Sequence, residues 1–401
     1  MGLLAACSAG RPRVPSPADV PVRSAPGTTT ASAGAGPTPT ETVTPSTRWR
    51  SIPGAGLKAA SALVDVLAKG PEDAWAAGFE AGAEDEDGVP VLVHWNGSVW
   101  TRIPVEDSEL RVRAFDVAGP DDIWLVGSSP SGGGVSHWDG RVWATPRPFG
   151  VADGYRPYDV ATGKGRAVIV GSGPDGAFAI QWDGKRFRRM RSGTDGVFEA
   201  VALKDGHVWA VGRRAREDCQ GTRPTVAHMS PDGRWSYNED MSVPEVLGGR
   251  LESVLAITPT DVWAVGAIGG YDPEMYPPAN CRPTSDGEEG AETPGSLPTP
   301  LVMHWNGSAW QRVELPPVKG ALHGLTAFGK NNLWASGTDP RQPGVALLLH
   351  YDGTSWTREG ISAGGSGHAA IAAIPGTSNM WAVGSVGEDT DHEHAFVARR
   401  H

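Results

Sequence analysis

The stretch TPTDVWAVG, residues 258–266, decides the fold because nearly the same phrase recurs along the chain. The related phrases are GPEDAWAAG at 70, GPDDIWLVG at 119, KDGHVWAVG at 204, GKNNLWASG at 329 and GTSNMWAVG at 376. In each, a turn leads into a tryptophan flanked by small or branched residues, and a glycine ends the phrase. This pattern is typical of a short buried β-strand. Its recurrence predicts a repeat architecture.

A second phrase follows each of these strands, as in VLVHWNGSVW at 91, VSHWDGRVW at 135 and LVMHWNGSAW at 301. Asn-Gly and Asp-Gly between alternating apolar residues indicate two-residue β-hairpins. In that register Trp95 would face Ser98 and lie diagonally from Trp100. Each unit also opens with an apolar stretch such as ALVDVLA at 62. The unit is therefore four strands, a to d, as in a propeller blade.

Seven such openings predict an all-β, seven-bladed propeller of four-stranded antiparallel blades. The last unit ends in HAFVARRH without a strand d, whereas TRWRSIP at 47 matches the strand d phrase SVWTRIP at 98. We expect residues 47–53 to complete the last blade, which removes its open edge. The propeller then spans 47–401. The sixteen tryptophans all fall on strand b, the end of strand c or strand d, so we interpret them as structural.

The repeat resembles the tryptophan-rich propeller repeats of bacterial secreted proteins and lipoproteins, which are grouped loosely with kelch-like and galactose-oxidase-like propellers. The resemblance covers residues 47–401. Strand b lacks the double glycine of kelch repeats, and the Trp-Asp pairs lie in hairpin turns, unlike those of WD40 repeats. The resemblance implies a fold but no activity, because propellers carry many unrelated functions.

The amino end, MGLLAAC, contains Leu4 to Cys7, which resembles a bacterial lipobox. That resemblance implies lipidation of Cys7 and an extracytoplasmic protein, secreted or anchored to the cell membrane. Only six residues precede Cys7, fewer than a signal peptide has, and a chance match in a disordered tail is the alternative. The rest of residues 1–46 is a Pro/Ser/Thr/Ala tether with little to bury.

The net charge of −11 argues against nucleic acid as a partner. No apolar run reaches the roughly 18 residues that a membrane span needs, so we expect membrane contact only through a lipid anchor. We expect a monomer and no cofactor. Ca²⁺ at Glu84–Asp87 is an alternative, but a solvated acidic loop explains these carboxylates more simply.

Five polar residues at the start of strand a align in blades two to six, and we expect them to ring one mouth of the central channel: Arg113, Arg156, Glu199, Glu252 and His323. Mutual salt bridging is the simpler interpretation, and recognition of a charged ligand is the functional one. The variable b-to-c loops belong to the same face. We therefore take this face as the candidate binding surface.

Cys219 and Cys281 lie in the b-to-c loops of blades four and five. Outside the cytoplasm such a pair favours a disulfide, and two free thiols are the alternative. The basic stretch KRFRRMR at 185 belongs to an outer strand. We interpret it as charge that blocks edge pairing, with contact to anionic lipid or wall polymer as the functional alternative.

The resulting hypothesis is a non-catalytic binding propeller that recognises a protein, glycan or small ligand on the b-to-c face. The alternative is a carbohydrate-active hydrolase or lyase with its site in the central channel, which would need paired carboxylates. We assign no catalytic residue and no metal ligand. The sequence leaves the ligand unidentified.

Overall fold

The structure is a computed structural model that describes residues 48–53, 56–58, 60–80, 88–106, 109–130, 132–146, 154–163, 165–190, 196–215, 222–238, 241, 248–269, 297–342, 344–365, 369–386 and 394–401. The chain divides into two compact units, residues 1–42 and 43–401. Every described residue belongs to the second unit.

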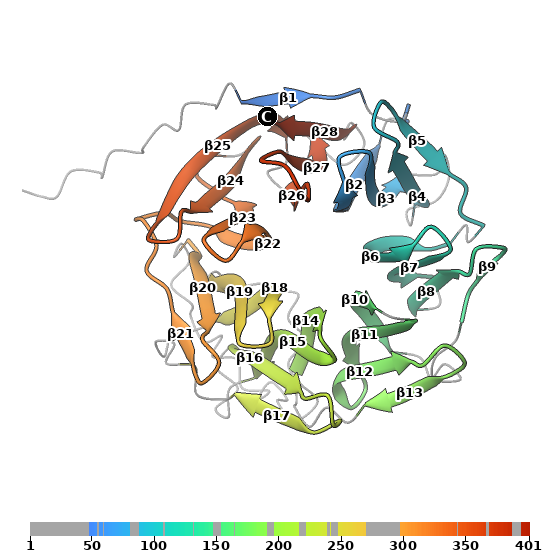
Figure 1. Cartoon of the computed structure of the whole chain (residues 1–401), viewed down its shortest axis with the longest axis horizontal. Helices are drawn as coiled ribbons and strands as arrows, with labels where there is room; N and C mark the ends of the chain where they lie inside the picture. Colours follow the sequence, from blue (N-terminus) through green and yellow to red (C-terminus); the bar gives the residue numbers. More distant parts are fainter. Residues whose placement is uncertain are drawn as a thin grey trace, which may run out of the picture. The chain divides into compact units, whose positions relative to one another are not determined.

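The described residues form seven four-stranded antiparallel sheets around a common axis, and none of these residues is helical (Figure 1). Blade one is β2 (Ser61–Gly70), β3 (Asp73–Glu80), β4 (Val89–Trp95) and β5 (Trp100–Ile103). Blade two is β6 (Arg111–Gly119), β7 (Asp122–Ser129), β8 (Gly132–Trp138) and β9 (Trp143–Ala144). Blade three is β10 (Arg156–Gly163), β11 (Arg166–Gly173), β12 (Gly176–Trp182) and β13 (Phe187–Met190).

The remaining blades repeat this order. Blade four is β14 (Gly196–Lys204), β15 (His207–Ala215), β16 (Thr222–Met229) and β17 (Trp235–Asn238). Blade five is β18 (Gly249–Thr258), β19 (Asp261–Ile268), β20 (Thr299–Trp305) and β21 (Trp310–Arg312). Blade six is β22 (Ala321–Gly329), β23 (Asn332–Thr338), β24 (Gly344–Tyr351) and β25 (Trp356–Gly365). Blade seven is β26 (Ala369–Ala373), β27 (Met380–Val386), β28 (His394–Arg400) and β1 (Trp49–Ser51).

The ring closes where the sequence predicted. Strand β1 pairs antiparallel with β28, with Trp49 opposite Arg400 and Ser51 opposite Ala398. The amide of His401 also donates to the carbonyl of Arg48 at 3.1 Å. The first strand of the propeller is thus the outer strand of its last blade, beside β28 in Figure 1.

The strand b tryptophan of one blade packs against the aromatic pair on strands c and d of the next blade. Trp263 of blade five lies 5.2 Å from Tyr351 and 6.1 Å from Trp356 of blade six, measured between ring centroids. Three further junctions have the same arrangement: Trp124 with Trp182 and Phe187, Trp209 with Trp305 and Trp310, and Trp381 with Trp95 and Trp100. The tryptophans at these junctions are therefore structural, and they hold neighbouring blades together.

The hairpins between strands c and d differ from the prediction. Trp95 and Trp100 lie directly opposite each other, so four residues rather than two form the loop. The side-chain oxygen of Asn96 accepts the amides of Ser98 at 3.1 Å and Val99 at 3.0 Å. This local bonding stabilises the wider loop. The aromatic pair is consequently a direct cross-strand pair rather than a diagonal one.

A second repeated feature links strands b and c. In blade five Asp261 accepts hydrogen bonds from the Nε1 of Trp263 and from the Nε2 of His304, both at 2.9 Å, while the two rings stack at 4.1 Å. Blades one, two and six have the same unit, with Asp73, Asp122 and Asn332 as the acceptors. The acceptor satisfies an otherwise buried indole N–H.

Blade four departs from this unit because His207 stands where the other blades have an acidic or amide acceptor. The Nε1 of Trp209 is buried without a hydrogen-bond partner, and His207 Nδ1 lies 2.8 Å from His228 Nε2. Burial, with a further contribution from the charge of His207, lowers the pKa of His228 to about 4. We expect His207→Asp to stabilise the protein by about 1 kcal/mol at neutral pH, because the new carboxylate accepts from both rings.

The gain should grow on acidification. His228 with a depressed pKa stays neutral in the folded protein while it is protonated in the unfolded chain, so its contribution is lost as pH falls from about 6.5 to 4. Urea unfolding of His207→Asp and His207→Ala at pH 8 and pH 5 tests this. Equal stability of the two variants would contradict the missing-acceptor explanation.

Candidate functional site: a charged rim around the axis

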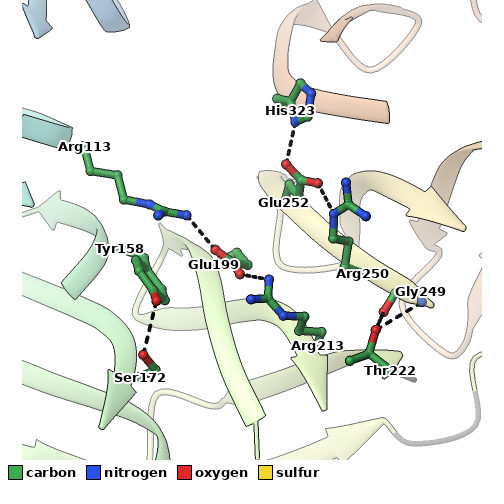
Figure 2. Close-up of polar contacts among 10 residues, drawn as sticks. All are labelled: Arg113, Tyr158, Ser172, Glu199, Arg213, Thr222, Gly249, Arg250, Glu252 and His323. Carbon is green, nitrogen blue, oxygen red and sulfur yellow. Dashed lines mark hydrogen bonds and ion pairs between the residues drawn. The ribbon is translucent and has the colours of Figure 1, made fainter. Parts of the chain in front are cut away.

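Six of the seven innermost strands carry a β-bulge at the same register, opposite the glycine that ends the strand b phrase. The bulged residues are Val64, Arg113, Tyr158, Glu199, Glu252 and His323. A bulged residue leaves the ladder, which re-aims its side chain. Figure 2 shows the polar ones converging with two arginines, and we call this set the rim: Arg113, Tyr158, Glu199, Arg213, Arg250, Glu252 and His323.

Four of the five aligned residues occupy the bulge, but the prediction for Arg156 was wrong. Arg156 pairs with Ser172, whereas the bulge of blade three is Tyr158. Arg156 therefore corresponds to Arg250, which likewise pairs with the residue after the glycine. Matching the letters of RPYDVAT to those of VRAFDVA places Arg156 two residues before the bulge of its own strand.

Glu199 is the centre of the first half of the rim. Its Oε2 accepts from Nη2 of Arg113 at 2.8 Å, and its Oε1 accepts from Arg213. The guanidinium of Arg113 lies 4.0 Å from the ring centroid of Tyr158, and the hydroxyl of Ser172 donates to that of Tyr158 at 3.3 Å. Blades two, three and four are thus joined by one ion pair and one cation–π contact.

Glu252 is the centre of the second half. Its two oxygens bond Arg250 and His323, and the far nitrogen of His323 lies 3.2 Å from the hydroxyl of Thr338. Burial alone would raise the pKa of Glu252, but the charge and hydrogen bonds of His323 and Arg250 outweigh it and lower the pKa to about 2. Glu252 is therefore an ionised structural partner at neutral pH.

In space, the hydroxyl of Thr338, the imidazole of His323 and the carboxylate of Glu252 follow one another in the order of a hydrolase triad. Thr338 lies within β23, however, and is paired with Ala321 on one side and Ala346 on the other. The contact is best understood as support for His323.

Three aspartates on the innermost strands of blades one to three tie each blade to the next. Asp65 accepts the amide of Phe115 at 3.4 Å, Asp116 that of Thr162 at 2.7 Å, and Asp159 that of Val201 at 2.7 Å. Burial raises the pKa of Asp65 to about 7. Burial also raises the pKa of Asp159 to about 8; the hydrogen bond from the Val201 amide opposes this increase, and the charge of Asp65 adds to it. Burial also raises the pKa of Asp116.

These shifts predict that the propeller loses stability as pH rises from about 4 to 8. In that window the unfolded chain has released protons that the folded aspartates still hold, so the free energy of unfolding falls with pH. Asp159→Asn keeps an oxygen for the Val201 amide. We expect the free energy of unfolding of this variant, relative to that of the parent, to be about 2 kcal/mol higher at pH 9 than at pH 5. Denaturant unfolding across this range measures the difference.

Asp183→Asn is the matched control. Backbone amides of the hairpin, that of Arg186 foremost, lower the pKa of this surface carboxyl. Its contribution is therefore lost only in acid, below the window tested. A parallel pH profile for Asp159→Asn and the parent would show that Asp159 titrates normally.

Some of the other predicted features lie outside the described residues, and the rest can be located in the structure. Cys7, Cys219, Cys281 and Glu84–Asp87 lie outside the described residues. The basic stretch falls on outer strand β13 as predicted, where Arg188 and Arg189 pair with Asp183 and Asp175. Within the described ranges no helix is long and apolar enough to cross a membrane, and no three His, Cys, Asp or Glu residues are grouped to hold a metal ion.

Comparison with known proteins identifies the fold. The chain is similar to YCF48 bound to D1 peptide, with 15% identity, 89% of this chain and 98% of that chain covered, and a TM-score of 0.54. It is also similar to U3-55K, with 12% identity, 88% of this chain and 98% of that chain covered, and a TM-score of 0.53. A third similar structure is the Kuenenia stuttgartiensis hydrazine synthase, with 12% identity, 86% of this chain and 96% of that chain covered, and a TM-score of 0.56. No protein-family model and no curated protein matches the chain. At such identities the shared property is the propeller fold.

Proposed function

We propose that this propeller is a non-catalytic binding protein that engages a protein partner through the rim. The observation that carries the proposal is the rim itself, in which bulges on blades two to six place polar side chains around one end of the axis. Paired charges and a stacked tyrosine hold these side chains in fixed positions. Such preorganisation lowers the entropy that binding costs.

The hydrolase alternative has less support. A glycosidase needs a carboxylic acid of raised pKa beside a second carboxylate. Among the described carboxyl groups, raised pKa values occur at Asp65, Asp116 and Asp159. These three accept amides of neighbouring blades, while the rim glutamates are already matched by arginines or a histidine.

A protein ligand also agrees with the comparisons, because the solved structure of YCF48 holds a peptide. The shared fold does not transfer that peptide to this chain. It supports the choice of a polypeptide over a glycan or a small molecule as the first ligand class to test.

Site-specific photo-crosslinking tests the proposal. A photoreactive phenylalanine analogue replaces Tyr158 on the rim or, as the control, Val142 in the c-to-d hairpin of blade two, at the opposite end of the strands. We expect one defined partner from cell-envelope extract to be captured from position 158 and not from position 142. Capture from position 142 alone would place the binding surface elsewhere and refute the proposal.

We further propose that the protein is extracytoplasmic, lipidated at Cys7, and bridged by a disulfide between Cys219 and Cys281. The lipobox-like LAAC and the tether support the first two points. Detergent-phase partitioning of the parent against Cys7→Ser tests lipidation. Intact mass after alkylation, with and without reduction, tests the disulfide.

A further inference from the structure

Arg113 is the rim charge most open to solvent. Its side chain is 52% exposed, against 6% for Glu199 and 18% for Arg213. Nη2 bonds Glu199 and the guanidinium plane rests on Tyr158. In the part of the chain that the structure describes, Nε and Nη1 donate to no protein acceptor. Arg113 is thus a fixed guanidinium with donors left for a ligand.

The sign of the rim differs from that of the whole protein. Three arginines face two glutamates in the rim, whereas the chain carries a net charge of −11. Within the rim the arginines outnumber the glutamates by one, a balance that favours an anionic ligand there.

A cationic ligand would find few acceptors in the rim. Each oxygen of Glu199 already accepts from an arginine, and the oxygens of Glu252 accept from Arg250 and His323. A lysine or arginine of a partner would therefore meet carboxylates whose charge is already paired. An incoming carboxylate meets the unused N–H groups of Arg113 and displaces only water.

We propose that Arg113 binds a carboxylate of an acidic peptide segment, with Glu199 and Tyr158 as positioning residues. This inference rests on the proposed function and names the chemistry of the partner. A guanidinium can bind a carboxylate through two parallel N–H···O bonds, which a point charge cannot reproduce. Nη2 has two hydrogens and bonds Glu199 with one, so its second N–H together with Nε or Nη1 would form that pair. The rim side chains come from blades two to six, so a peptide segment of several residues can face more than one of them.

Fluorescence anisotropy with defined peptides tests this inference. The probes are a labelled peptide of about ten glutamates and the same peptide made of glutamine. We expect the glutamate peptide to bind at least tenfold more tightly than the glutamine peptide, and less tightly as salt is added. Arg113→Gln should weaken binding of the glutamate peptide at least tenfold, and Arg113→Lys should restore only part of it.

Arg188→Gln is the matched control, because Arg188 is also an exposed arginine bonded to a carboxylate but lies on outer strand β13. It should change the affinity by less than twofold. Arg113→Gln leaves Glu199 paired with Arg213, so an unchanged melting temperature will show that the variant is folded. Equal binding by Arg113→Gln and the parent would overturn the inference.

The two proposals fail in different ways. A partner that crosslinks from position 158 but is not displaced by the glutamate peptide leaves the rim as the binding surface and overturns its acidic specificity. Capture only from position 142 refutes the proposed function whatever the peptides do. Displacement of the position 158 partner by the glutamate peptide, but not by the glutamine peptide, supports both.

Discussion

Gly266→Ala should destabilise the propeller by roughly 3 to 5 kcal/mol, which is at the upper end for a single substitution. A Cβ on Gly266 would lie 2.1 Å from the backbone oxygen of Arg250 and 2.8 Å from the Cα of Leu251. Both atoms belong to the main chain of the paired strand, so no side-chain rotation relieves the clash. The strands must separate at the centre of blade five.

Urea unfolding measures this loss, and Gly329→Ala is the control. Gly329 also lies at a strand position in the repeat, but a Cβ there meets nothing within 4 Å. That variant should match the parent or be slightly more stable, because alanine restricts the unfolded chain. A loss below 1 kcal/mol for Gly266→Ala would show that the two strands can separate at little cost.

The clash at Gly266 recurs at the glycine that ends the strand b phrase in five other blades. A Cβ would meet a backbone oxygen of the neighbouring strand at 1.9 to 2.0 Å in each, at Gly78, Gly127, Gly171, Gly212 and Gly337. Gly78 faces the bulge at Val64, and the other glycines face the bulges that aim the rim side chains. The glycine of the repeat therefore serves the rim as well as the fold, because it permits the close approach that accompanies the bulge.

Much of the fold could be predicted from the sequence because each repeat restates the same local signals. The strand b phrase, the hairpin dipeptide and the tryptophan positions recur, and errors in one blade are corrected by the others. Closure could be predicted because the phrase around Trp49 matches a strand d and the last unit lacks one. All of these depend on side-chain pattern and chain order.

What could not be predicted depends on single-residue register. The four-residue hairpin loop results from the Asn96 side chain bonding two amides, which an Asn-Gly pair alone does not distinguish from a tighter turn. The bulge has a fixed register relative to the strand b glycine, which the letters of strand a alone do not show, and so Tyr158 was missed in favour of Arg156. A glycine opposite an apolar-polar step in strand a is the signal that could have indicated the bulge.

The rim partners show the same limit. Arg213 and Arg250 were missed as rim residues because their place in the rim depends on side-chain hydrogen bonds to glutamates, which the strand pattern does not reveal. Arg213 lies on β15, a different strand from that of its partner Glu199. Mutual salt bridging was nevertheless the simpler expectation for these charges, and the ion pairs of Glu199 and Glu252 confirm it. The sequence indicated the charged residues, and the structure was needed to show that the Arg113 side chain remains half exposed to solvent.

Trp381→Ala should also cost roughly 3 to 5 kcal/mol, the usual range for truncating a buried tryptophan. The Trp381 side chain is fully buried, and its centroid lies 5.0 Å from that of Trp95 and 5.1 Å from that of Trp100. It fills the junction between blades seven and one. The propeller is closed there by pairing and packing of its terminal strands, so the cavity lies at the point where the ring can open.

Trp263→Ala is the matched variant, since it removes the same side chain from the junction of blades five and six. We expect a similar global loss but a different local response in native-state hydrogen exchange. Amides of β1 and β28 should open at lower free energy in Trp381→Ala, because the packing beneath them is lost. In Trp263→Ala these strands should change no more than the rest of the protein. Uniform loss of protection in both variants would mean that the ring unfolds as one unit and that its closure is no weaker than its other junctions.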